Sequence, residues 1–284
     1  MKQNTPSLTA YKIAIMRAAH QIFDNPKVFE DPIALKIIGA KGNSEIRIEK
    51  RKFKTRLHNY LRAIVVARSR FVEDELSLAI KRGVRQYVIL GAGLDTFAYR
   101  NPYSSDGLKV FEVDYPATQE WKQQQLNTAQ IAVPETLAFV PVDFEDQSLV
   151  GQLQKTGFRT NQPSFFSWLG VTMYLPRETM METLKHVSSH SPSGSEIVFD
   201  YVVPPSSQSF MRRLIFRLLS KKVRSFGEPW HAFYDPNSLI NDLKNIGFTQ
   251  VDDINPDEIN SRFFKDRADK LMVGRFGHLM KAQL

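Results

Sequence analysis

Two glycines and a later aspartate have the residue types and the spacing that point most directly to chemistry. In VILGAGLDTFAYR (88–100), an apolar strand candidate runs straight into Gly91 and Gly93. Glycines at a strand end let the backbone approach a ligand closely, and a helix that begins behind them presents free N–H groups. Asp114 ends the next strand candidate 23 positions after Gly91, near the spacing of ~20 at which an acidic side chain accepts hydrogen bonds from a ribose. Together these features predict a site for a ligand that contains a nucleoside.

The residues that follow Gly93 argue against a dinucleotide. A dinucleotide site would have a third glycine where this chain has Thr96, and Asp95 lies close to the place of the pyrophosphate anion. S-adenosylmethionine has ribose hydroxyls, an ammonium group and a positively charged sulfur, so an acidic lining suits it better. Asp143 and Phe144 follow the third strand candidate, where a carboxylate can accept the adenine amino group and an aromatic ring can cover the base. We therefore expect S-adenosylmethionine as the cofactor, with an NAD-dependent oxidoreductase as the weaker alternative.

The composition excludes several kinds of chemistry. The chain has 284 residues and no cysteine, so it has no disulfide framework, no cysteine zinc site and no thiol nucleophile. His186 and His190 are four positions apart, but no acidic residue lies between them as in a metal-binding HExxH helix, and no metal is expected. No apolar run approaches the ~18 residues that cross a bilayer, and residues 1–20 lack the apolar region of a signal peptide. A cytoplasmic location is expected.

The elements that position these residues follow from the apolar pattern. Residues 1–85 have helical spacing and predict an N-terminal helical segment, while 86–284 predict a core with a helical cap near 206–236, all in one structural domain. Apolar strand candidates alternate with stretches long enough for crossover helices, which predicts an α/β fold with a doubly wound, Rossmann-like sheet. The strand candidates are 87–90, 110–113, 137–142, 165–168 and 197–202, with weaker ones near 250–251 and 271–273.

A basic segment leaves a second class of function open. Between Lys41 and Arg85 there are thirteen basic and five acidic residues, a difference of +8 that equals the net charge of the whole chain. Such a segment attracts polyanions, so the alternative is a nucleic-acid-binding protein or an RNA methyltransferase. No RNA-binding module is recognisable, and a solvated helix surface is the simpler interpretation. A nucleic acid partner is therefore not expected.

Six motifs carry a family resemblance. They are FEDPIA (29–34), ARSRFVED (67–74), VILGAGLDTFAYR (88–100), VFEVDYPATQEWK (110–122), PVDFED (141–146) and WLGVTMYLP (168–176). In this order they resemble the leucine carboxyl methyltransferase family, especially its bacterial branch of S-adenosylmethionine-dependent methyltransferases. The resemblance covers roughly residues 8–205, and GAGLDT with EVDYP is its most specific pair. It implies a class I methyltransferase fold with N-terminal helices and a cap.

The resemblance also implies roles for matching residues. Arg68 would contact the carboxylate of the cofactor's methionine part, and Gly91 and Gly93 would line the cofactor. Asp114 would hold the ribose, and Asp143 with Phe144 would bind adenine.

Three positions depart from the family pattern. Glu30 and Leu169 stand where the protein-methylating members have residues of their KDP and AEC motifs, and Phe97 stands where an arginine is common. We therefore expect Leu169 to contact the cofactor, but through a side chain different from that of the protein-methylating members. The resemblance consequently supports cofactor binding more firmly than any particular substrate.

The acceptor side is less determined by the sequence. A carboxylate acceptor is already ionised at neutral pH and needs no base, whereas a hydroxyl acceptor is helped by one. His231 in GEPWHAF is the candidate base, Arg100, Tyr174 and Tyr201 are candidates for orienting an acceptor, and no residue is assigned as catalytic. The expected function is that of an S-adenosylmethionine-dependent O-methyltransferase. Its acceptor would be a carboxylate or hydroxyl of a small molecule or of a polypeptide C-terminus.

Overall fold

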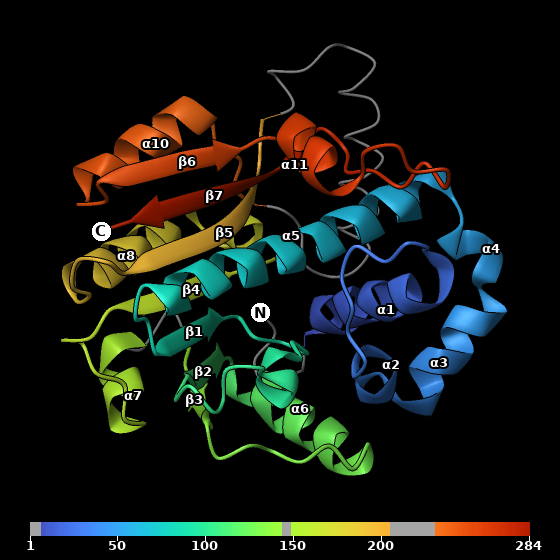
Figure 1. Ribbon diagram of the computed structural model, residues 1–284, viewed down its shortest axis with the longest axis horizontal. Coiled ribbons are helices and arrows are strands. Elements are labelled where there is room, and N and C mark those ends of the chain that lie inside the picture. The colour runs from blue at the N-terminus through green and yellow to red at the C-terminus, as the bar shows by residue number, and fades with distance from the viewer. Residues whose placement is uncertain (1–6, 144–148, 205–230) are drawn as a thin grey trace.

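The core of the molecule is a single β-sheet with helices on both faces (Figure 1). The computed structural model describes residues 7–143, 149–204 and 231–284. Within these residues the strands are β1 (Gln86–Leu90), β2 (Lys109–Asp114), β3 (Leu137–Pro141), β4 (Ser164–Trp168), β5 (Glu196–Val202), β6 (Gln250–Ile254) and β7 (Gly277–Gln283). Their order is β3-β2-β1-β4-β5-β7-β6, with β1 to β5 parallel and β7 antiparallel to both neighbours. The predicted doubly wound, Rossmann-like α/β fold is confirmed.

Helices cover both faces because the central strands carry apolar side chains on each. On one face, Ala67 and Leu76 of the long helix α5 (Arg56–Lys81) pack with Tyr87, Phe165 and Val198 of the sheet. The same face carries α6 (Pro116–Thr128) and α11 (Pro256–Phe263), and the other carries α7 (Leu149–Lys155), α8 (Arg177–Ser189) and α10 (Pro236–Asn245). Of the helices in the described ranges, none combines the length and the apolarity needed to cross a lipid bilayer.

Four shorter helices precede α5 and pack together at one side of the molecule (Figure 1). They are α1 (Leu8–Phe23), α2 (Ala34–Ile37), α3 (Gly39–Ile48) and α4 (Lys50–Phe53). A buried ion network joins them to α5: Asp24, which caps α1, accepts hydrogen bonds from Nε of Arg62 at 2.6 Å and from its Nη2 at 2.8 Å. His20 of α1 contacts the same carboxylate through Nδ1 at 2.7 Å. The network fixes α1 relative to the helix that lies on the sheet.

The structure corrects the predicted end of the chain. The apolar stretch 271–273 is not a strand, and the last strand is β7 instead. Leu271 and Val273 are buried in the core beneath α11, where the side chain of Asn260 accepts from N of Val273 at 2.9 Å and donates to its O at 3.3 Å. The predicted cap near 206–236 lies mostly outside the described residues, and α10 begins at Pro236.

Candidate functional site

A cavity of about 350 Å³ lies at the carboxyl ends of β1 and β4. The chain turns from β1 toward β2 on one side and from β4 toward β5 on the other, so this is the switch point at which open α/β sheets bind ligands. Its volume falls within the ~300–1,000 Å³ typical of small-molecule sites. The cavity brings together eight of the residues singled out in the sequence: Arg68, Gly91, Gly93, Asp114, Asp143, Leu169, Tyr174 and His231.

The loop after β1 requires its two glycines. Gly91 has φ +67° and Gly93 has φ +47°, a region that residues with a Cβ rarely adopt. A Cβ at Gly91 would overlap Cγ2 of Val171, and one at Gly93 would lie 3.0 Å from Cβ of Ala10 in α1. The expected α-helix behind the glycines is wrong, because the structure has instead the short 3₁₀ helix η1 (Phe97–Arg100). The donors at this turn are therefore loop N–H groups rather than a helix N-terminus.

Asp114 closes the turn from the neighbouring strand. Its Oδ2 accepts from N of Gly93 at 2.5 Å, and its Oδ1 accepts from N of Tyr115 at 2.7 Å. A carboxylate keeps further lone pairs when it accepts two hydrogen bonds, so the group is oriented and still able to bind hydroxyls. Asp143 lines the same cavity beyond the end of β3, and Phe144 lies outside the described residues. These acidic groups fit a ribose and an adenine amino group.

Arg68 brings a buried positive charge to the lining of the cavity. Its Nη1 pairs with Oδ2 of Asp200 at 2.5 Å, and Oδ1 of Asp200 accepts from N of Gly170 at 2.6 Å. The guanidinium lies flat against Gly170, since a Cβ there would be 2.6 Å from Nη2. Asp200 and the absence of a side chain at position 170 thus hold Arg68 at the cavity next to Leu169. The arrangement fits the carboxylate of an amino acid moiety.

One wall of the cavity was missed from the sequence, and it belongs to α1. Ala10 and Ala14 are four positions apart, so they share one helix face, and they line the cavity together with Ile13 and Arg17. Arg17 donates to O of Leu94, pairs with Asp31 at 2.9 Å from Nε, and lies 3.7 Å from Asp95. The small residues let α1 approach the glycine loop, and Arg17 fastens the two. This small-residue spacing was the available clue, but it does not identify the element on which the face packs.

Several residues singled out in the sequence lie elsewhere. The guanidinium of Arg100 pairs with Glu73 and stacks over the ring of Phe29 at 4.9 Å, so it does not line the cavity. Tyr201 lines a second cavity, and its hydroxyl donates to Oδ1 of Asp253 at 2.7 Å. The side chains of Arg100 and Tyr201 are held in these places by partners that are distant in the sequence.

Two of the family departures lie outside the cavity lining as well. Glu30 is exposed, and Phe97 is buried against Tyr87 with their ring centroids 5.0 Å apart. The third, Leu169, contacts the cavity directly. Leu169 is therefore the departure with a direct bearing on a bound ligand.

Glu112 points away from the cavity although it precedes Asp114 by only two residues. Its Oε2 pairs with Nζ of Lys122 at 2.6 Å, and both side chains are almost completely buried. Burial raises the pKa of the Glu112 carboxyl to about 7 even though Lys122 opposes the shift. This ion pair holds α6 on β2 behind the site.

We expect Lys122→Met to lower the free energy of unfolding by about 3–5 kcal/mol above neutral pH, because it leaves the Glu112 carboxylate buried and unpaired. A raised pKa means that the folded state binds more protons than the unfolded state between their two pKa values, so stability falls as pH rises through that range. The loss should therefore shrink toward acidic pH, where Glu112 takes up a proton. Urea unfolding near pH 5 and pH 8 measures it, with the Glu112→Gln, Lys122→Met double variant as control. An equal loss at both pH values would contradict the assignment.

The chain matches a known family model and is similar to two described bacterial proteins. The leucine carboxyl methyltransferase family model matches residues 10–188. A Bacillus subtilis (strain 168) protein named "Putative S-adenosyl-L-methionine-dependent methyltransferase YktD" is 34% identical over 302 residues, 99% of each chain. A Mycobacterium marinum (strain ATCC BAA-535 / M) protein of the same description is 31% identical, over 78% of this chain and 71% of its own.

A solved structure shows the same fold. The crystal structure of a DUF574 family protein from Streptomyces avermitilis MA-4680 superposes with a TM-score of 0.58 at 14% identity, over 99% of this chain and 98% of its own. With the family model and the relatives in agreement, the resemblance seen in the motifs is confirmed: the chain belongs to the leucine carboxyl methyltransferase family.

Proposed function

We propose that the chain transfers the methyl group of S-adenosylmethionine to an oxygen atom of an acceptor, a carboxylate or a hydroxyl, in the cytoplasm. As a member of its family, the chain is an S-adenosylmethionine-dependent methyltransferase. The observation that carries the proposal is the cavity at the switch point, which Asp114, Asp143 and Arg68 line together with the glycine loop. The acidic groups suit the nucleoside and the arginine suits the methionine carboxylate, which together orient one ligand.

The proposed chemistry needs positioning more than it needs acids or bases. The cofactor supplies an electrophilic methyl group on a positively charged sulfur. Held by Arg68, Asp114 and Asp143, the cofactor would supply this methyl group to a lone pair of the acceptor oxygen, and its sulfur would keep the electron pair of the broken bond. Holding the reactants in line and excluding water lowers the barrier of such a displacement. Here α1, through Ala10 and Arg17, closes the cavity over the glycine loop.

The acceptor determines whether a base takes part. A carboxylate releases no proton, whereas a hydroxyl does. His231 lines the cofactor cavity beside Tyr174 and is held through its backbone N, which donates to O of Met173 at 2.8 Å. We assign the proton of a hydroxyl acceptor to the imidazole of His231.

The acceptor atom is tested by base treatment of labelled product. Protein is incubated with methyl-tritiated S-adenosylmethionine and a protein-free extract of bacterial metabolites, and the product is treated with alkali. A carboxyl methyl ester releases volatile methanol. A label that resists alkali, as a methyl ether does, is assigned to oxygen, nitrogen or sulfur from the NMR shift of the methyl group in the purified product. His231→Ala should slow ether formation and leave ester formation unchanged. Label attached to nitrogen or sulfur would contradict the proposal, as would the absence of any transfer by protein that binds S-adenosylhomocysteine.

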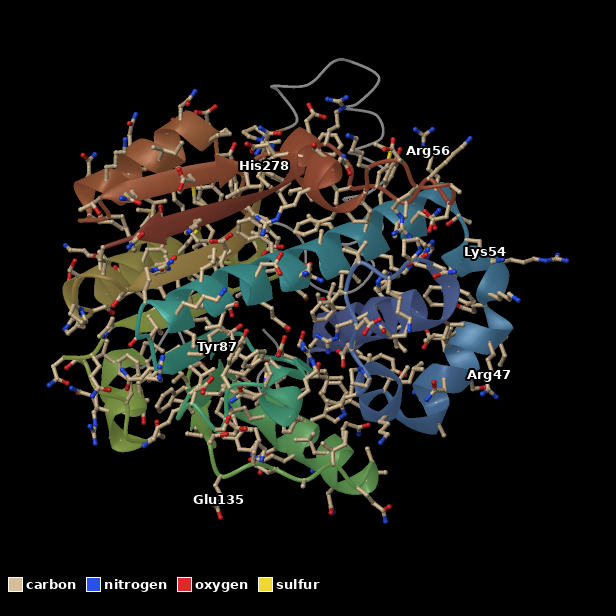
Figure 2. The ribbon with its side chains drawn as sticks, in the orientation of Figure 1. Arg47, Lys54, Arg56, Tyr87, Glu135 and His278 are labelled. Atoms are coloured by element: carbon tan, nitrogen blue, oxygen red, sulfur yellow. The ribbon has the colours of Figure 1, made fainter. Side chains whose placement is uncertain are left out.

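The basic segment gives little support to a nucleic acid substrate. Arg62 and Arg68 are buried in ion pairs with Asp24 and Asp200, so two of its charges face inward. Figure 2 shows Lys54 projecting away from the body of the molecule, and the exposed Arg56 donates from Nε to the hydroxyl of Tyr60 at 2.7 Å. Neither Lys54 nor Arg56 lines a cavity around the cofactor site. An oxygen acceptor bound next to the cofactor is the better supported proposal.

A further inference from the structure

A second cavity of about 270 Å³ adjoins the cofactor cavity. It is enclosed by α1, α4 and α5, by the end of β5 and by the chain before β7. The two cavities share five lining residues, which we call the common wall: Thr9, Ile13, Arg68, Gly170 and Tyr174. A ligand in the second cavity would therefore touch residues that also line the cofactor cavity.

The interior of this second cavity is mainly apolar and rich in aromatic rings. Phe53 and His58 meet edge to face with centroids 5.7 Å apart, and Tyr60 and Phe276 add two further rings to the lining. The aliphatic lining comes from Ile15, Met16, Leu61, Ile64, Val65 and Met173. Aromatic edges and faces favour another ring in offset or edge-to-face contact. The volume is slightly below that of sites for drug-sized ligands, which limits the occupant to a small molecule.

The charged groups of the lining come from the N-terminal helices. Lys12, Glu45 and Lys52 belong to α1, α3 and α4, and Lys52 forms an ion pair with Glu49. The common wall has one positive charge, Arg68, which Asp200 neutralises. The second cavity therefore has a polar side at the N-terminal helices and an apolar body against α5, which does not match a long charged peptide.

Thr9 supplies a hydrogen-bonding group that the fold itself does not use. Thr9 is 8% exposed, and among the described residues its Oγ1 has no hydrogen-bond partner. Buried hydroxyls are nearly always hydrogen-bonded, so an unpartnered one needs an explanation. Thr9 belongs to the common wall, where a bound ligand can provide the missing partner.

We propose that the second cavity is the acceptor site, and that the acceptor is a small molecule with an apolar, ring-containing body whose nucleophilic oxygen lies at the common wall beside Thr9. This inference rests on the proposed function, since it places the acceptor of that same methyl transfer. The ring lies among Phe53, Tyr60 and Phe276, and the hydroxyl of Thr9 positions the oxygen. A polypeptide C-terminus is disfavoured because the mainly apolar lining offers few hydrogen-bond partners to the peptide groups that lead to it.

Filling the second cavity from the side away from the cofactor tests the proposal. Leu61→Trp enlarges a side chain of α5 that lines this cavity and not the cofactor cavity. Leu78→Trp on the same helix is the matched control, because Leu78 is 43% exposed and lines neither cavity. Binding is measured by saturation-transfer NMR on protein loaded with S-adenosylhomocysteine. The probes are phenol, 4-cresol, benzoic acid, phenylacetic acid, cyclohexanol, hexanoic acid, toluene and a short peptide ending in leucine.

The proposal predicts that the ring-containing probes bind the wild type and the Leu78→Trp variant, and that their affinity falls at least about tenfold in Leu61→Trp. Thr9→Val should weaken 4-cresol by about three- to tenfold and leave toluene unchanged, because it removes only the hydrogen-bonding group. Equal binding to Leu61→Trp, binding of the peptide alone, or no binding of any probe would overturn it. Calorimetry with S-adenosylhomocysteine on each protein separates the two claims: failure of the wild type to bind it would contradict the proposed function instead.

Discussion

Replacement of Asp114 by alanine is expected to weaken S-adenosylhomocysteine binding by about 100-fold or more. Two ribose hydroxyls donating to one carboxylate make charge-assisted hydrogen bonds, each about 1.5–3 kcal/mol, and 1.4 kcal/mol corresponds to a tenfold change in affinity. The substitution also removes the acceptor of the Gly93 N–H, which lies 2.5 Å from Oδ2. The glycine loop therefore loses its orientation together with the ligand contact.

Calorimetric titration measures this loss, and Asp106→Ala is the control. Asp106 is an exposed acid in the connection between β1 and β2 that lines neither cavity around the site. Its replacement removes the same charge and should leave the affinity unchanged. A thermal unfolding curve for each variant shows whether the fold is retained. Unchanged affinity in a folded Asp114→Ala protein would contradict the assignment of the ribose site.

Replacement of Arg62 is expected to destabilise the fold strongly. Arg62→Met should lower the free energy of unfolding by about 3–5 kcal/mol, because it leaves the buried Asp24 carboxylate without its two arginine hydrogen bonds. The wall formed by α1 would loosen as well, so S-adenosylhomocysteine affinity should fall with stability. Urea unfolding measures the change. Arg70→Met is the control on α5, since the exposed pair with Asp74 is worth no more than about 1 kcal/mol.

The same network predicts the acid sensitivity of the fold. Burial alone would raise the pKa of Asp24, but hydrogen bonds from His20 and Arg62 outweigh burial and lower it. A lowered carboxyl pKa adds stability above the unfolded value of ~3.9, and that stability is lost as pH falls through the folded value. The wild type should therefore lose stability steeply below pH ~4, and Arg62→Met should lose less over that range. Parallel acid titrations of the two proteins would contradict this.

The inner strands could be predicted because their apolar runs have few other interpretations. Tyr87 to Leu90 and Phe165 to Trp168 are buried on both faces of the sheet, as parallel strands between helix layers must be. β7 could not be predicted, because its polar residues find partners only in the folded sheet. Nδ1 of His278, which is labelled in Figure 2, lies 2.9 Å from Oδ1 of Asp253. Nζ of Lys281 donates to Oε2 of Glu75 in α5 at 2.7 Å.

The candidate site also contains residues that could be predicted from the sequence and residues that could not. Gly91, Gly93 and Asp114 were found because the spacing from the end of β1 to the end of β2 places them at adjacent strand ends. The α1 wall depends on the packing of a helix that precedes the sheet by more than sixty residues, which no local pattern records. Arg100 was expected near the acceptor, but Glu73 on α5 draws it to the other side of the loop. Local spacing thus predicted the cavity residues at the strand ends, whereas tertiary packing determines the positions of α1 and Arg100.

Titration of the purified protein with S-adenosylhomocysteine, beside a titration with NAD, tests the central claim most directly. The structure predicts saturable binding of S-adenosylhomocysteine with one site per chain and no binding of NAD, because Thr96 and Asp95 stand where a pyrophosphate needs glycine and a neutral loop. Binding of NAD without S-adenosylhomocysteine, or no binding of S-adenosylhomocysteine by the folded protein, would contradict it.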